Sequence, residues 1–189
     1  MISLFDANFL LILFDPQGRV PSDRETGMPL VERARERIDF LVSTLGSRRE
    51  KIIIPAPALA EFLLLTKGWD AYLTEIKKKA VFQIAGFNQP EAIELVIQGK
   101  IDGKKIRNRV ETWAKLKYDR QIVAIAKTHR VEVIYSADRD IHRLAAKNEI
   151  ACKGLADLPL PPPQQLRFKE LAIPGAGNEK YDSSIFNEE

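Results

Sequence analysis

Short apolar runs alternate with longer segments of helical periodicity along the first 155 or so residues. The strand-like runs are residues 2–5, 51–54, 80–84 and 131–135, with a last short run at 150–152. Strands that alternate with helices form βαβ units, which build a mainly parallel sheet with helices on both faces. We therefore predict an α/β fold with three layers, α/β/α, around a mainly parallel central sheet.

The segments between these runs carry helix signals. One amphipathic helix is predicted from spacings of three and four residues, with Gly46 as its terminator. Its apolar face consists of Leu30, Ala34, Ile38, Leu41 and Leu45. Pro57 suits the first turn of the next helix, and Pro90 opens another that Gly99 is expected to close. A further helix is predicted to begin at Tyr118.

The length of 189 residues suits one domain, which we assign to residues 1–158. Residues 159–189 are rich in proline and acidic, and we predict a C-terminal extension there. This extension has three basic and five acidic residues, a net −2, which leaves +5 for residues 1–158 of the chain's +3. A basic body suits an anionic partner such as nucleic acid.

Several protein classes are excluded by composition. The longest apolar runs, residues 9–14 and 62–65, are far too short to span a membrane. The N-terminus does not have the pattern of a secretory signal, so a cytoplasmic location is expected. Cys152 is the single cysteine, which excludes an internal disulfide and a thiolate metal cluster. No glycine-rich phosphate loop is present, and Asn8 stands where a haloacid dehalogenase would have a second acid after Asp6.

Four acids are placed at one edge of the predicted sheet. Asp6 follows the first strand, Glu61 lies in the first turns of the helix after the second, and Asp138 follows the strand at 131–135. Asp119 is expected to open the helix that precedes this last strand. In right-handed βαβ units each strand ends, and the next helix begins, at the carboxyl edge of the sheet. All four acids are therefore expected at that edge, with Asp140 as a candidate fifth member.

Clustered carboxylates require a positive charge. Two charges about 4 Å apart repel by roughly 4 kcal/mol at an effective dielectric constant near 20. A divalent cation removes this cost, and oxygen ligands without Cys or His favour Mg²⁺ or Mn²⁺. Such a cation binds phosphate oxygens and activates water, so metal-assisted phosphodiester hydrolysis is the reaction class that fits.

Each acid also has a structural interpretation. Asp6 is a suitable helix cap, and acids at the helix starts expected for Asp119 and Asp138 favour the helix dipole. Glu61 has apolar neighbours in the chain, where an unpaired carboxylate would be costly. The Trp69 side chain could stack on bases, although packing in the core is favoured.

A basic stretch precedes Asp119. It could hold a phosphate backbone or form a solvated helix face, and the acidic extension could compete for it. The residues assigned to RNA binding are Lys104, Lys105, Arg107, Lys115 and Lys117.

Four segments resemble the successive motifs of PIN-domain proteins. They are Phe5-Asp6-Ala7-Asn8, Pro57 to Glu61, Tyr118 to Ala126, and Ser136 to Asp140. The resemblance covers about residues 1–155, and it implies a metal-dependent ribonuclease, most often a VapC-like toxin of a toxin–antitoxin pair. It also implies RNA as substrate, an antitoxin protein as a possible partner, and a homodimer. The loop at 15–29 and the proline-rich extension depart from the usual pattern.

The resemblance assigns roles to individual residues. It makes Asp6, Glu61, Asp119 and Asp138 the catalytic, metal-binding acids. Asn8, Ser136 and Asp140 become supporting polar residues, with Asp140 a candidate ligand as well. The main hypothesis is a metal-dependent endoribonuclease that uses Mg²⁺ or Mn²⁺. The alternative is a catalytically silent PIN-like module that binds RNA or a protein.

Overall fold

The computed structural model describes residues 1–15, 20–22, 29–101 and 110–162, except for the side chains of residues 100–117. Its centre is a five-stranded sheet in which every pair of neighbouring strands is parallel, in the order β3-β2-β1-β4-β5. The strands are β1 (Ile2–Phe5), β2 (Lys51–Pro55), β3 (Phe82–Ala85), β4 (Val133–Tyr135) and β5 (Ala151–Lys153). The predicted α/β class is confirmed.

Side chains alternate between the two faces of the sheet, as the period of two in a strand requires. Leu4 in β1 is in register with Ile53 and Ile134, and all three lie in one buried cluster. Phe5 and Tyr135, one position further on, belong to the opposite cluster. Both faces of the central strands are therefore covered, which explains their nearly continuous apolar sequences.

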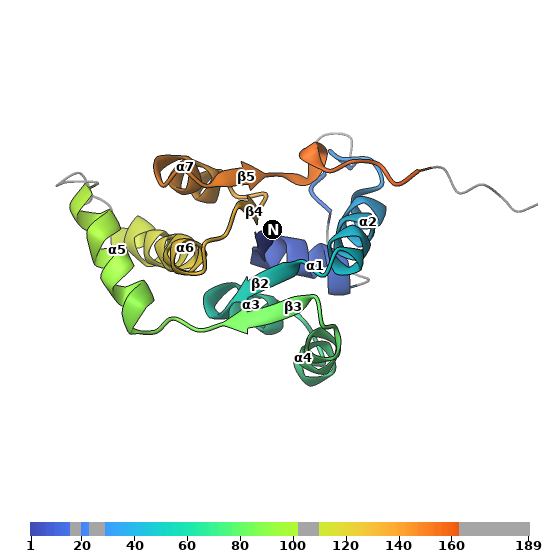
Figure 1. The fold of residues 1–189 in the computed structure, drawn as a ribbon, viewed down its shortest axis with the longest axis horizontal. Helices are drawn as coiled ribbons and strands as arrows, with labels where there is room; N and C mark the ends of the chain where they lie inside the picture. The colour runs from blue at the N-terminus through green and yellow to red at the C-terminus, as the bar shows by residue number, and fades with distance from the viewer. Residues whose placement is uncertain (16–19, 23–28, 102–109, 163–189) are drawn as a thin grey trace, which may run out of the picture.

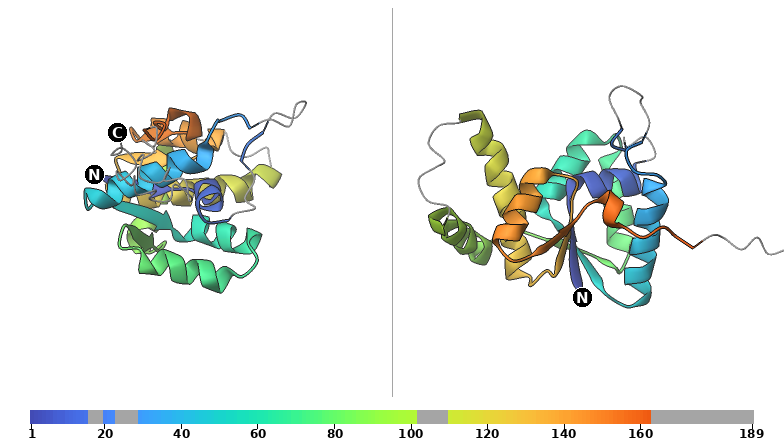
Figure 2. Two further views of the ribbon diagram at one scale, coloured as in Figure 1. Left: turned by 90° about the vertical axis from the view of Figure 1, so that its right-hand side faces the viewer. Right: turned by 90° about the horizontal axis from the view of Figure 1, so that it is seen from above.

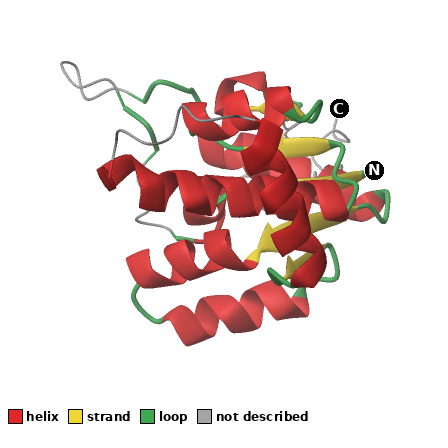
Figure 3. Ribbon diagram, turned by 90° about the vertical axis from the view of Figure 1, so that its left-hand side faces the viewer, coloured by secondary structure: helices red, strands yellow, loops and turns green. Residues whose placement is uncertain are grey.

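Helices cover each face. Those described are α1 (Ala7–Phe14), α2 (Ala34–Ser47), α3 (Ala56–Leu65), α4 (Trp69–Lys78), α5 (Gln89–Ile101), α6 (Val110–Thr128) and α7 (Arg139–Lys147). One buried cluster joins the sheet to α1, α2 and α4, and the other joins it to α6 and α7. These two groups lie on opposite sides of the sheet in Figure 1, and helices hide much of the sheet in the side view of Figure 3.

Helices α5 and α6 pack against each other at one end of the molecule (Figure 2). Polar contacts join them: Thr128 donates its hydroxyl to Glu91 at 2.8 Å, and Lys127 pairs with Glu94 at 2.7 Å. The helix α6 is longer than predicted, because it begins at Val110 and not at Tyr118. Its first turns belong to a stretch that was described as polar and basic, although Val110, Trp113 and Ala114 have helical spacing.

Three further predicted helix boundaries were wrong. The second helix begins at Ala34, and Leu30 lies outside it and is exposed. Gly46 stays inside this helix, and Arg49 takes the left-handed conformation after its end, with φ of 56°. The fifth helix continues past Gly99 to Ile101. A glycine inside a helix costs only about 1 kcal/mol, which tertiary packing readily offsets.

The described chain ends on the core. The short 3-10 helix η1 (Leu155–Asp157) follows β5, and both Leu155 and Leu158 are buried against α2. Arg37 of α2 donates a hydrogen bond to the backbone carbonyl of Leu158. The core therefore includes residue 158, and residues 163–189 of the predicted extension lie outside the described residues. None of the described helices is long and apolar enough to cross a membrane.

Candidate active site

A cavity of about 500 Å³ opens at the carboxyl edge of the sheet. Its walls contain all four predicted acids, and each acid comes from a different part of the fold: the β1–α1 junction, α3, α6 and the start of α7. Apolar side chains form the rest of the walls. The lining residues are Asp6, Asn8, Pro57, Ala60, Glu61, Leu64, Leu65, Tyr118, Asp119, Asp138 and Ile141. The structure thus shows the lateral convergence on which the sequence was silent.

Asp6 is fixed on both sides of its carboxylate. It is only 4% exposed, and one oxygen accepts a hydrogen bond from the backbone N–H of Ala7 at 2.7 Å, which caps α1. The other oxygen accepts from the Ser136 hydroxyl, also at 2.7 Å. The capping and the cavity interpretations of Asp6 therefore hold together. An ionised carboxylate has about four lone-pair positions, so two remain for a ligand in the cavity.

Ser136 joins two of the acids. Besides donating to Asp6, its hydroxyl oxygen accepts from the backbone N–H of Asp138 at 3.0 Å. The carbonyl of Ser136 lies 2.8 Å from Nε2 of His142, one turn into α7. Asn8 reaches the same loop, where its side-chain oxygen accepts from the backbone N–H of Ala137 at 3.3 Å. The supporting residues thus hold the β4–α7 loop against the start of α1.

Asp138 and Asp140 differ in position. Asp138 caps α7 by accepting from the backbone N–H of Asp140 at 2.7 Å, and it lines the cavity. Asp140 is not among the residues that line the cavity, and its carboxylate pairs with Arg143 at 2.8 Å. The structure therefore brings Asp138 to the site and leaves Asp140 in a supporting position on the helix.

Asp119 lies in the interior of α6, nine residues after the helix begins. The prediction that it opens a helix was wrong, so the helix dipole does not account for an acid at this position. It is 6% exposed and lines the cavity. A buried carboxylate is costly unless it is hydrogen-bonded, paired with a positive charge or bound to a metal.

Glu61 has a different environment from the one its sequence neighbours indicate. Phe62 of α3 is buried, but the side chain of its neighbour Glu61 is exposed and lines the cavity. The argument from the cost of burial therefore does not apply to it. Glu61 is related to the other acids because it lines the same cavity as Asp6, Asp119 and Asp138.

The acids influence one another electrostatically. Burial, as the largest cause, raises the pKa of Asp6 from 3.8 to about 6; the hydrogen bonds from Ser136 and Ala7 oppose this shift, and the charges of Glu61 and Asp138 add to it. A cation would remove this repulsion. Among the described residues, no three Cys, His, Asp or Glu side chains are already arranged as a metal site. The donor set still fits Mg²⁺ or Mn²⁺, because Mg²⁺ is commonly held by one or two carboxylates and keeps several waters.

Other predicted residues are less well placed by the structure. Lys104, Lys105 and Arg107 lie outside the described residues, and Lys115 and Lys117 belong to α6 with side chains outside the description. Trp69 is exposed, so the prediction that it packs in the core was wrong. The sequence predicted no functional role for Tyr118, yet its side chain is exposed and lines the cavity.

The chain was compared with known proteins. No family model matches it, and no curated protein matches it. Among solved structures, a chain of VapBC2 from Rickettsia felis, bound to a DNA fragment from their promoter, aligns with 82% of this chain and 98% of its own length. The identity is 12% and the TM-score is 0.50, which shows a shared PIN-like fold. A chain of VapBC-1 from nontypeable Haemophilus influenzae aligns over the same shares at 12% identity and a TM-score of 0.48.

Proposed function

We propose that this chain is a metal-dependent endoribonuclease that hydrolyses RNA phosphodiester bonds. One observation carries the proposal: Asp6, Glu61, Asp119 and Asp138 come from four separate segments and line a single cavity. Structural acids usually pair with basic groups, but Asp6 has two other carboxylates as its charged neighbours. Such an arrangement is typical of functional sites.

The four acids would hold Mg²⁺ or Mn²⁺, which when bound polarises the phosphodiester and lowers the pKa of a water. The chain's own residues prepare the site. Ser136 keeps the carboxylate of Asp6 oriented toward the cavity, and the backbone cap of α7 does the same for Asp138. Ile141, which is buried, gives the cavity an apolar wall beside the acids, and a less polar surrounding strengthens electrostatic interactions.

Membership in a toxin–antitoxin pair is part of the same proposal. It is supported by the resemblance of the four motifs to VapC-like proteins and by the fold shared with a chain of VapBC2. On this proposal RNA is the substrate and an antitoxin protein is a partner. The predicted homodimer and the predicted basic RNA-binding residues remain predictions.

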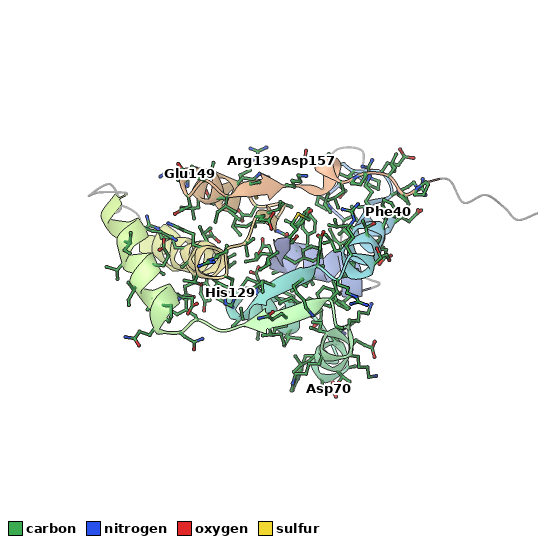
Figure 4. The ribbon with its side chains drawn as sticks, viewed as in Figure 1. Phe40, Asp70, His129, Arg139, Glu149 and Asp157 are labelled. Carbon is green, nitrogen blue, oxygen red and sulfur yellow. The ribbon has the colours of Figure 1, made fainter. Side chains whose placement is uncertain are left out.

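A cleavage assay on single-stranded RNA tests the activity. Wild-type protein is expected to cleave with Mg²⁺ or Mn²⁺ and to stop in excess chelator. Asp119→Asn is expected to lower kcat/KM by about 1,000-fold or more, because loss of a ligand removes several kcal/mol of transition-state stabilisation. The matched control is Asp70→Asn, since Asp70 is exposed on α4 and lies away from the cavity (Figure 4). Cleavage that persists in Asp119→Asn would refute the proposal.

The alternative, a silent PIN-like module, is distinguished by calorimetry. Titration of Mn²⁺ into the wild-type protein is expected to show binding that Asp6→Asn abolishes and Asp70→Asn retains. A folded wild-type protein that binds neither Mn²⁺ nor Mg²⁺ would favour the silent module.

A further inference from the structure

Tyr118 is an exposed aromatic residue beside a buried acid. Its side chain is 57% exposed, whereas Asp119, the next residue in α6, is 6% exposed. Both line the cavity. The same cavity is lined from α3 by Leu64, which is 85% exposed, and Leu65, which is also exposed. The cavity therefore combines an acidic interior with an apolar rim.

The apolar rim contributes little to the core of the protein. Leu64 and Leu65 are absent from both buried clusters, and so is Tyr118. Exposed apolar side chains gathered at a cavity mark a binding surface more often than a structural one. A ligand of this cavity therefore needs an apolar face that contacts the rim and a part that tolerates four nearby carboxylates.

An unpaired nucleobase meets this requirement. A cation held by the acids would bind a phosphate of RNA. The apolar rim beside the acids then offers an uncharged contact to the neighbouring base. Aromatic side chains stack on the π-faces of unpaired bases, and this contact contributes about 1–3 kcal/mol per base with little sequence preference. Bases in a duplex are already stacked on each other and do not offer such a face.

We infer that Tyr118 stacks on an unpaired base next to the phosphate that is cleaved, with Leu64 and Leu65 bordering the same base. This inference rests on the proposed ribonuclease function and adds to it the residue that selects unpaired RNA. An apolar segment of a protein partner is the competing occupant of the rim.

The test uses three variants and one set of RNA oligonucleotides. Tyr118→Leu removes the ring, Tyr118→Phe keeps it, and Trp69→Leu removes an exposed ring that does not line the cavity. Tyr118→Leu is expected to lower kcat/KM about 10-fold, in line with the loss of one stacked base. Tyr118→Phe and Trp69→Leu are expected to stay within about 2-fold of wild type, and a fully paired duplex is expected to be cleaved poorly by all.

Abasic substitutions identify the contacted base. In the wild-type protein, one abasic nucleotide beside the cleaved bond is expected to lower kcat/KM by the same factor of about 10. In Tyr118→Leu the same abasic nucleotide is expected to cause little further loss, because the contact has already been removed. Losses that multiply in full would show that the base and the ring are independent, and would overturn the inference.

The outcomes separate this inference from the proposed function. If wild-type protein cleaves and Asp119→Asn does not, but Tyr118→Leu equals wild type on every oligonucleotide, the stacking inference fails and the nuclease stands. If wild-type protein cleaves nothing, the proposed function fails, and stacking is then tested by binding of an oligonucleotide that contains fluorescent 2-aminopurine. Equal affinity of wild type and Tyr118→Leu would overturn the inference there. Unchanged RNA binding with weakened binding of a protein partner would assign the rim to that partner.

Discussion

Two buried acids in different regions of the molecule have pKa values shifted in opposite directions. Asp6 lies at the carboxyl edge of the sheet, and Glu91 lies between α5 and α6; each is 4% exposed. Each accepts one hydrogen bond from a side-chain hydroxyl and one from a backbone N–H. The donors are Ser136 and Ala7 for Asp6, and Thr128 and Asn88 for Glu91.

The neighbouring charges differ between the two. Burial raises the pKa of Glu91, but the hydrogen bonds from Thr128 and Asn88 and the nearby His129 outweigh it, and the pKa is lowered. His129 lies at the end of α6 (Figure 4). Burial also raises the pKa of Asp6, to about 6, and there the nearby acids Glu61 and Asp138 add to the shift. Burial thus outweighs the hydrogen bonds at Asp6, with the nearby acids adding to it, whereas the hydrogen bonds outweigh burial at Glu91. The two acids have different surroundings although their exposed fractions and donors are alike.

The largest expected effect follows from removing the structural acid. Glu91→Ala removes the acceptor that the Thr128 hydroxyl and the Asn88 N–H share, and only the hydroxyl has another acceptor nearby, the Ile125 carbonyl at 3.1 Å. Hydrogen bonds to charged groups contribute about 1.5–3 kcal/mol each, so we expect the free energy of unfolding to fall by about 4 kcal/mol. Urea unfolding followed by circular dichroism measures this. A loss below about 1 kcal/mol would contradict the assignment of Glu91 to structure.

The second effect has the opposite sign and depends on pH. Asp6 has a pKa of about 6 in the folded protein against 3.8 when unfolded, so the folded state binds its proton more tightly. Its contribution to stability is therefore present at low pH and is lost as the pH rises from 3.8 to 6. The total change is about 3 kcal/mol, at about 1.4 kcal/mol per pKa unit.

Asn at position 6 has no proton to lose. Without divalent cations, Asp6→Asn is thus expected to be more stable than wild type by as much as about 3 kcal/mol at pH 7.5, and nearly equal to it at pH 3.5. Urea unfolding of both proteins at the two pH values checks this. A stability difference that does not change with pH would show that Asp6 is not strained by its surroundings.

Cation binding provides the third comparison. A cation at ten times its Kd stabilises the folded state by about 1.4 kcal/mol. We expect Mn²⁺ to raise the Tm of the wild-type protein and to leave the Tm of Asp119→Asn unchanged. Glu91→Gln is the matched control in the other region, and its lower Tm should still rise with Mn²⁺. An equal rise in the Tm of all three proteins would show that Mn²⁺ does not bind at Asp119.

The smallest effect concerns the hydroxyl that holds Asp6. Ser136→Ala removes its hydrogen bonds to Asp6 and to the Asp138 N–H, and we expect a loss of about 1 kcal/mol in the free energy of unfolding. Because the Ser136 hydrogen bond lowers the pKa of Asp6, this variant should raise that pKa above about 6. Titration of the Asp6 carboxyl by NMR is the measurement. A pKa that stays at about 6 would show that the hydroxyl matters only for packing.

Much of this fold is predictable from sequence because the apolar runs and helix periods are strong local signals. Asp6 and Asp138 were placed correctly at the edge of the sheet, because Asp6 directly follows β1 and Asp138 comes three residues after the end of β4. Asp119 was misplaced in its helix because residues 110–117 were grouped with the basic stretch, although Val110, Trp113 and Ala114 have the spacing of a helix. The helix end predicted at Gly46 was wrong because glycine permits a helix to end without requiring it.

The convergence of the acids was beyond local signals. It depends on the strand order, which sets β1 between β2 and β4 and so brings Asp6 close to Ser136, 130 positions away. The exposure of Glu61 and Tyr118 depends on how α3 and α6 face each other across the cavity. Such facts arise from tertiary packing, which overrides what neighbours in the chain indicate.

The central position of β1 also sets an order of events during protein synthesis. Among the five strands of the sheet, β1 is made before the others and needs partners on both sides, whereas β4 is made only after residue 132. Until then one edge of β1 is unpaired, and neither the Ser136 hydroxyl nor Asp138 exists to complete the cavity. A growing chain with an unpaired strand edge is also prone to association, which makes this stage a natural point for help from chaperones.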